Sequence, residues 1–165
     1  MHFLKNRNFD KKSGIPISEI LLKSKNYDII ILSGGFDDLI KTFLVKHDLL
    51  DLIKEVFAIP TTVSDDGKIT VNSIPKEWGG PCRSPGAGII CKASIIKYYM
   101  AKNQHYEKLI YVGDGSNDIC PPPILGVNDI VFPRQDYKME SLIKNQCISA
   151  KIIPWKDGFD IMKYI

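Results

Sequence analysis

The segment with the clearest chemical potential is residues 113–118, which read G-D-G-S-N-D directly after the apolar run 109–112. Such a run predicts a buried strand, and the two glycines allow a sharp turn at its end. One or two carboxylates suffice for a hard cation such as Mg²⁺, which keeps several waters. We predict that Asp114 binds the metal and that Asp118 orients a water or a neighbouring lysine. The alternative is a turn whose polar side chains bond only local backbone.

Two further segments carry groups that suit an anion. Ser33 and Gly34 follow the apolar run 27–32. If they precede a helix, its free N–H groups and its dipole favour negative charge there, so we predict that both residues bind phosphate. Read alone, the same pattern describes an N-cap serine before a glycine turn. Lys92 stands near a predicted helix start, where the dipole disfavours a cation unless an anion is close. We predict that it neutralises phosphate and a reacting carboxylate; the alternative is a surface lysine.

The elements that must position these groups alternate along the chain. Apolar patterning predicts strands at 27–32, 55–60, 109–112, 130–132 and 148–153, and helices at 16–25, 36–46, 89–101, 119–125, 137–144 and 157–164. A β-hairpin with an Asp-Gly turn is predicted at 61–71, and a Gly- and Pro-rich loop at 75–88. The alternation indicates an α/β fold with a mainly parallel sheet and helices on both faces. Ligands of such sheets bind beyond the carboxyl ends of the strands, so Ser33 and Asp114 should face one crevice.

Composition excludes several classes of function. The 165 residues are 44% hydrophobic with a net charge of +3, and the scattered basic residues argue against a nucleic-acid partner. No apolar run has the length of a membrane helix, and the first residues lack a signal-peptide core. The four cysteines form no C-x-x-C pair, which argues against zinc and favours small core residues in a reducing, cytoplasmic setting. Nothing in the sequence sets an oligomeric state.

Together, the Ser33, Lys92 and G-D-G-x-N-D segments resemble the haloacid-dehalogenase-type phosphatases, in the same order along the chain. Downstream, the sequence is similar to the eukaryotic branch that acts on phosphoethanolamine, phosphocholine or pyridoxal phosphate. The residues that carry this similarity are Ile119-Cys120-Pro121, Phe132-Pro133-Arg134, Tyr137, Leu142-Ile143 and Pro154-Trp155. The resemblance runs from about Ile15 to the end. It implies a Rossmann-like core that hydrolyses a small phosphorylated metabolite.

The resemblance also implies a mechanism with Mg²⁺ as cofactor. In this family an aspartate attacks phosphorus and forms an aspartyl-phosphate, which divides one difficult step into two. The residue matching Asp114 holds Mg²⁺ together with that nucleophile. The residues matching Ser33 and Lys92 bind phosphate. On this basis Lys92 and Asp118 are the expected catalytic residues of this chain, and Lys92 and the cation would stabilise charge on the phosphoryl oxygens.

The sequence departs from the family pattern at its start. The family opens with an apolar strand ending D-x-D-x-T, and nothing here matches it; residues 8–12 hold a single carboxylate, Asp10. We therefore interpret residues 27–165 as the C-terminal part of the core domain without its first strand, and residues 1–26 as a cap remnant and lead-in helix. The absent strand would lie between 27–32 and 109–112. Either these two pair directly or the isolated chain is marginally stable, because unpaired ladder groups cost about 1–3 kcal/mol each.

Three alternatives to this phosphatase stay open. Gly34 occupies a position where the branch usually has an aspartate, which makes the segment more similar to phosphoserine phosphatase. The chain, as given, is expected to hydrolyse phosphate esters poorly or not at all, so a catalytically inactive phosphate- or metal-binding remnant is a second alternative. In a third, the chain is a flavodoxin-like binding module in which Asp114 is only a turn residue.

Overall fold

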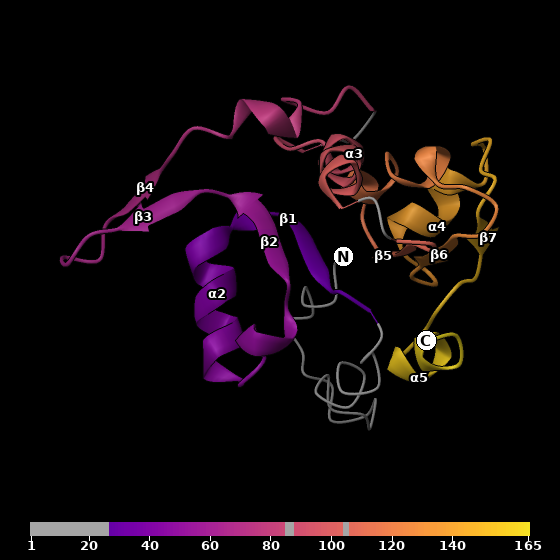
Figure 1. The fold of residues 1–165 in the computed structure, drawn as a ribbon, viewed down its shortest axis with the longest axis horizontal. Coiled ribbons are helices and arrows are strands. Elements are labelled where there is room, and N and C mark those ends of the chain that lie inside the picture. Colours follow the sequence, from indigo (N-terminus) through magenta and orange to yellow (C-terminus); the bar gives the residue numbers. More distant parts are fainter. Residues whose placement is uncertain (1–26, 85–87, 104–105) are drawn as a thin grey trace.

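The computed structural model describes residues 27–84, 88–103 and 106–165. The predicted helix 16–25, the suggested cap remnant 1–26 and Asp10 lie outside this part of the chain. Within it, two parallel sheets and a hairpin form (Figure 1). The first sheet pairs β1 (Ile30–Phe36) with β2 (Glu55–Ile59), and the second has the order β5 (Ile110–Gly113), β6 (Ile130–Pro133), β7 (Lys151–Ile152). The hairpin joins β3 (Thr61–Val63) to β4 (Ile69–Val71).

Four α-helices lie among the described residues: one between β1 and β2, one before β5, one between β6 and β7, and one after β7. They are α2 (Asp37–Lys46), α3 (Lys92–Lys102), α4 (Lys138–Ile143) and α5 (Gly158–Met162). Short 3₁₀ turns lie at η1 (Leu50–Leu52), η2 (Lys76–Trp78), η3 (Ser116–Asp118) and η4 (Pro122–Ile124). No helix among the described residues combines the length and apolarity needed to cross a membrane.

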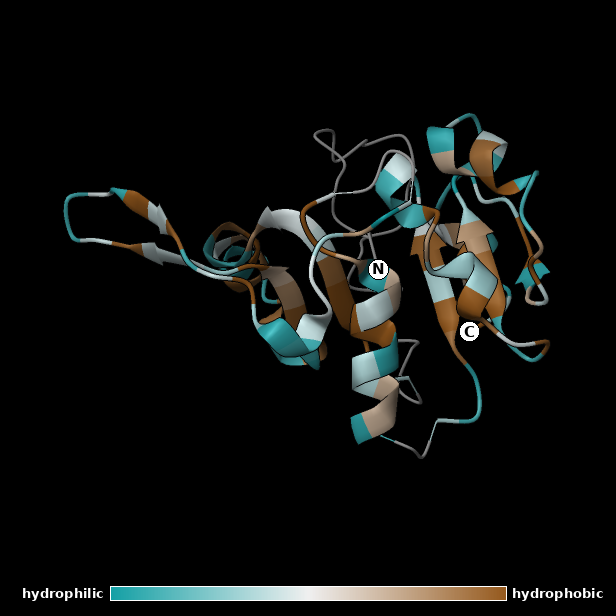
Figure 2. Ribbon diagram, turned by 90° about the horizontal axis from the view of Figure 1, so that it is seen from above, coloured by the Kyte–Doolittle hydropathy of each residue, from teal (hydrophilic) through white to brown (hydrophobic). Residues whose placement is uncertain are grey.

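The apolar residues of the strands alternate between two faces, each covered by helices. Ile31 of β1, together with Ile29 just before the strand, faces the core formed with α2. Leu32 instead joins Tyr111 and Val131 in a larger core built around α3 and α4. On the far face of the second sheet, Val112 and Phe132 pack with Ile161 of α5, and Figure 2 shows the hydrophobic colour concentrated on the strands. The predicted α/β class, with helices on both faces and a small hairpin, is confirmed.

The predicted end of the first strand at Leu32 is wrong, because β1 continues to Phe36. Leu32 pairs with Phe57, and the next paired residues are Phe36 and Ile59. From the first of these pairs to the second, β1 advances by four residues and β2 by only two. The strand therefore bulges at residues 33–35 and regains its pairing at Phe36, one residue before α2. The predicted beginning at residue 27 is also too early, because pairing with β2 begins only at Ile30↔Glu55.

Three other predicted elements differ from the structure. No α-helix forms at 119–125, where three consecutive prolines, Pro121–Pro123, lack the N–H groups a helix needs; the 3₁₀ turn η4 takes its place. The strand predicted at 148–153 is only Lys151–Ile152. Pro154 interrupts the ladder before the isolated bridge at Trp155. Helix α3 begins at Lys92 rather than residue 89 because Ile89 and Ile90 form a bend, with Ile90 packed in the core.

The two sheets do not pair with each other within the described residues. β1 pairs with β2 alone and β5 with β6 alone, and both views place β1 on the side of its sheet that faces β5 (Figures 1 and 2). Direct pairing of these two strands, one of the two outcomes considered above, is thus not what the structure adopts. The sheets are joined instead through the core around α3, to which both contribute.

Candidate functional site

A buried ion pair lies at the centre of the candidate site. Lys92 Nζ donates to Asp118 Oδ1 at 2.5 Å, and the two side chains are 1% and 0% exposed. Charged groups of this kind are buried almost only when they are paired. The pair joins the first residue of α3 to the end of η3, so it connects two segments 26 residues apart in sequence. Of the two partners predicted for Asp118, a water or a lysine, the structure provides the lysine.

Asp118 also holds the turn that follows β5. Its Oδ2 accepts hydrogen bonds from the backbone N–H groups of Asp114, at 3.1 Å, and Gly115, at 2.9 Å. The Tyr111 hydroxyl donates to Oδ1 at 2.6 Å. Burial raises the pKa of Tyr111 well above its usual value, and the negative charge and hydrogen bond of Asp118 raise it further. Tyr111 therefore stays protonated and remains a donor to the carboxylate.

Asp114 lies half-buried at the carboxyl end of β5. Its amide is fixed by Asp118, and its carbonyl accepts from Met139 N at 3.1 Å. The backbone of this residue is therefore held on two sides, by the turn and by α4. A carboxylate on such a fixed backbone suits a hard cation with oxygen ligands.

Ser33 and Gly34 approach this turn from β1. Ser33 is buried and its Oγ accepts from Gly35 N at 3.1 Å. Gly34 is exposed, and a Cβ built on it would lie 3.8 Å from Asn117 Nδ2. The structure thus brings the predicted phosphate-binding segment, which lies in the bulge of β1, next to the Asp114 turn at the carboxyl end of β5.

The positive end of α2 is not where an anion would bind. Its first turn carries two carboxylates, Asp37 and Asp38, which already complement the helix dipole. Thr61 donates to Asp37 Oδ1 from both its N–H and its hydroxyl, each at 2.8 Å. Burial would raise the pKa of Asp37, but hydrogen bonds from Lys41 and Thr61 lower it overall. Ser33 also does not cap α2, because the N-cap is Phe36. The start of α2 therefore does not provide the anion site that the sequence pattern predicts for this region.

The expectation that the cysteines are core residues is wrong. Cys82, Cys91 and Cys120 are half-buried and Cys147 is exposed. Burial would raise the pKa of Cys91, but hydrogen bonds from the side chain and backbone of Ser94 lower it overall. Burial raises the pKa of Cys120 to about 12. Cys91 directly precedes Lys92 and Cys120 follows Asp118 by two residues, so both cysteines are close in sequence to the members of the ion pair.

Gly113 is required by the packing of Asp118. A Cβ at this position would lie 2.7 Å from Asp118 Cβ and 2.7 Å from Met139 Sδ. Met139 can move, but Asp118 is fixed by its hydrogen bonds. We expect Gly113→Ala to lower the free energy of unfolding by about 1–3 kcal/mol, as overpacking does. Urea unfolding measures it, with Gly126→Ala as the control, since its added Cβ meets only an ordinary contact at 3.7 Å. If both variants lose the same free energy of unfolding, the close packing of Asp118 against Gly113 is not the cause.

Comparisons with known proteins find similar phosphatases. The chain is 29% identical over 164 residues to a probable phosphatase phospho1 of Danio rerio, covering 90% of this chain and 57% of the relative. It is 24% identical over 157 residues to the pyridoxal phosphate phosphatase PHOSPHO2 of Bos taurus, covering 92% and 65%. For the phosphoethanolamine/phosphocholine phosphatase of Gallus gallus the identity is 24% over 172 residues, covering 84% and 63%.

The chain spans about six tenths of the length of these curated relatives. No solved structure matches it. A family model described as "Putative Phosphatase" matches residues 8–165, nearly the whole chain. This match confirms the resemblance to the eukaryotic branch of haloacid-dehalogenase-type phosphatases, and the chain belongs to that phosphatase family.

Proposed function

We propose that this chain carries the phosphate- and metal-binding part of a Mg²⁺-dependent phosphatase for small phosphomonoesters. The reaction would proceed through an aspartyl-phosphate, and the substrate would belong to the pyridoxal phosphate, phosphoethanolamine or phosphocholine class. The observation that carries this proposal is the buried Lys92–Asp118 pair, which lies against the turn that presents Asp114.

Lys92 suits the binding of a phosphoryl group. An ammonium has three N–H donors, and one of them goes to Asp118. The negative charge of Asp118 offsets the free-energy cost of burying the lysine and fixes the position of its ammonium group. A phosphate oxygen would therefore bind a cation that is already oriented. Pre-oriented charge stabilises the transition state of phosphoryl transfer without reorganisation during the reaction. Asp118 is in this sense a positioning residue that acts through Lys92 and through the Asp114 turn.

The residues at the strand ends fit a hard cation. Asp114 offers carboxylate oxygens, and Mg²⁺ needs only one or two such ligands beside its waters and a substrate phosphate. When bound, Mg²⁺ would neutralise charge on the phosphoryl oxygens. Ser33 and Gly34 would contact the phosphate from the opposite strand. Because Gly34 has no side chain, recognition of a substrate ammonium must come from other residues, and a phosphoserine-like substrate is the second candidate.

The names of the relatives support the substrate class. PHOSPHO2 of Bos taurus is named for pyridoxal phosphate and the Gallus gallus protein for phosphoethanolamine and phosphocholine. These are small phosphomonoesters with a cationic or aromatic amine-derived group. The shared element is the phosphate monoester, which in this proposal Ser33 and Lys92 bind directly and Asp114 binds through Mg²⁺.

Titration with Mg²⁺ and inorganic phosphate, followed by amide NMR, tests the binding part of the proposal. We expect the amides of residues 33–35 and 113–118 to shift when both are added. Asp114→Asn should remove the Mg²⁺ response, and Ser33→Ala should weaken the phosphate response. Asp66→Asn, in the exposed hairpin turn, serves as the control and should leave both unchanged. If neither segment responds, Asp114 is a turn residue and the flavodoxin-like alternative is favoured.

A further inference from the structure

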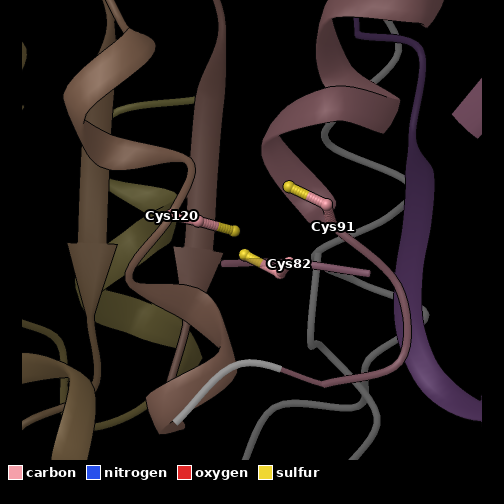
Figure 3. A group of neighbouring side chains, drawn as sticks. All are labelled: Cys82, Cys91 and Cys120. Atoms are coloured by element: carbon pink, nitrogen blue, oxygen red, sulfur yellow. The ribbon is translucent and has the colours of Figure 1, made fainter. Parts of the chain in front are cut away.

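Three cysteines from separate segments meet at one point (Figure 3). Cys82 lies in the loop after η2, Cys91 is the N-cap of α3, and Cys120 follows η3. Their Sγ atoms all lie within 4.8 Å of one another. Sequence spacing does not reveal this cluster, because its members are 9 and 29 residues apart, from 82 to 91 and from 91 to 120.

The geometry of the cluster suits a tetrahedral metal. With Zn–S bonds of about 2.3 Å, the sulfur atoms of a tetrahedral site lie about 3.8 Å apart. The sulfur atoms lie within 4.8 Å of one another. Small side-chain rotations, which move the sulfurs by about one ångström or less, are enough to reach that tetrahedral spacing. A disulfide between any two of them would leave the third unpaired, whereas a thiophilic cation uses all three. The half-buried position of each thiol leaves access for an ion and for a fourth ligand.

The helix start adds to this setting. Cys91 stands at the N-cap of an 11-residue helix, where the positive end of the helix dipole favours a thiolate. A soft sulfur donor set also selects a different metal from the oxygen donor Asp114, since thiolates prefer Zn²⁺ or similar ions and carboxylates with water prefer Mg²⁺.

We propose that Cys82, Cys91 and Cys120 form a second cation site, for Zn²⁺ or a similar thiophilic ion, with water or an added ligand in the fourth position. The site is independent of the proposed phosphatase activity. Its bound ion ties the loop that carries Cys82 to the residues next to Lys92 and Asp118, so it fastens the segments that hold the buried ion pair.

Titration of the reduced chain with Co²⁺ tests the site directly. Tetrahedral thiolate coordination gives a sulfur-to-cobalt charge-transfer band and intense visible bands, neither of which the Asp114 site can produce. We expect one equivalent of Co²⁺ to bind and one equivalent of Zn²⁺ to displace it. We expect the affinity for Co²⁺ to fall by more than about ten-fold in each of the variants Cys82→Ser, Cys91→Ser and Cys120→Ser. A loss of about ten-fold or more is found even when the mutated residue only hydrogen-bonds to a metal ligand. Cys147→Ser, at the exposed cysteine, should leave binding unchanged.

A second measurement covers variants that fold poorly. Zn²⁺ should raise the melting temperature of the unmodified chain and of Cys147→Ser, because it binds the native state, and it should not raise that of Cys82→Ser, whose change lies in a loop. Three results would overturn the proposal. They are no thiolate band in the unmodified chain, a band that survives in all three single variants, or a disulfide among the three cysteines under the reducing conditions used.

Discussion

Asp118→Asn should lower the free energy of unfolding by about 3–5 kcal/mol, the cost of breaking a buried ion pair by removing one partner. Lys92 would remain buried without a compensating charge, because both side chains are almost completely inaccessible. The amide also cannot replace the carboxylate geometrically. Asp118 accepts at both oxygens, from Lys92 and Tyr111 on one side and from backbone N–H groups on the other. An asparagine must turn its NH₂ group toward one of these sets of donors.

A double-mutant cycle separates the pair from its surroundings. Lys92→Met alone should also destabilise, because it leaves the Asp118 carboxylate buried with fewer donors. The double variant Lys92→Met/Asp118→Asn should lose less free energy of unfolding than the sum of the losses in the two single variants, because it leaves no buried charge at the pair. The exposed pair Lys163–Asp160, with side chains 66% and 33% exposed, provides the control, and Asp160→Asn should cost at most about 1 kcal/mol. Strictly additive single effects, or a loss for Asp118→Asn as small as the control, would show that the pair does not organise the site.

The turn after β5 could be predicted from sequence because its signals are local. An apolar run followed by glycines and carboxylates predicts a buried strand with a polar turn, and β5 and η3 have that form. The sequence leaves a water or a neighbouring lysine as the partner of Asp118, and the structure identifies that lysine as Lys92. The role of Tyr111 could not be predicted, because a tyrosine inside an apolar run has the pattern of an ordinary core position. Only the fold places its hydroxyl on the carboxylate.

Some of the features that the sequence did not predict depend on neighbours far along the chain. Two glycines after Ser33 normally end a strand, but here β2 pairs again with Phe36 and the glycines form a bulge. Cys82, Cys91 and Cys120 form no short-range pattern, and their thiols come close only in the folded chain, where the Lys92–Asp118 pair joins the start of α3 to the end of η3. Burial of Lys92 likewise results from its pairing with a residue in another segment, so the preference of lysine for the surface is overridden.

A strand that carries D-x-D-x-T, supplied ahead of this chain, should raise Mg²⁺-dependent hydrolysis of p-nitrophenyl phosphate by as much as about 10⁶. That factor is the loss seen when the nucleophile of a well-studied protease is removed. Among the described residues, β1 and β5 each pair on one side only. A strand inserted parallel between them would satisfy both ladders. Its carboxyl end would then place the first aspartate beside Ser33 and Asp114.

The rates of four samples test this prediction: the chain alone, the chain with the strand, the chain with a strand reading N-x-D-x-T, and the chain with a strand of scrambled sequence. Only the second should hydrolyse the ester above background, because only it adds both the strand and the attacking carboxylate. Robust hydrolysis by the chain alone, abolished by Asp114→Asn, would mean that the chain contains its own nucleophile. Equal rates with the aspartate and asparagine strands would exclude the aspartyl-phosphate route. A third outcome is that even the chain with the D-x-D-x-T strand hydrolyses the ester only at background, while phosphate and Mg²⁺ still shift the amides at 33–35 and 113–118. The chain would then be a remnant that binds both ligands without catalysis, because binding needs only the groups that the chain already has.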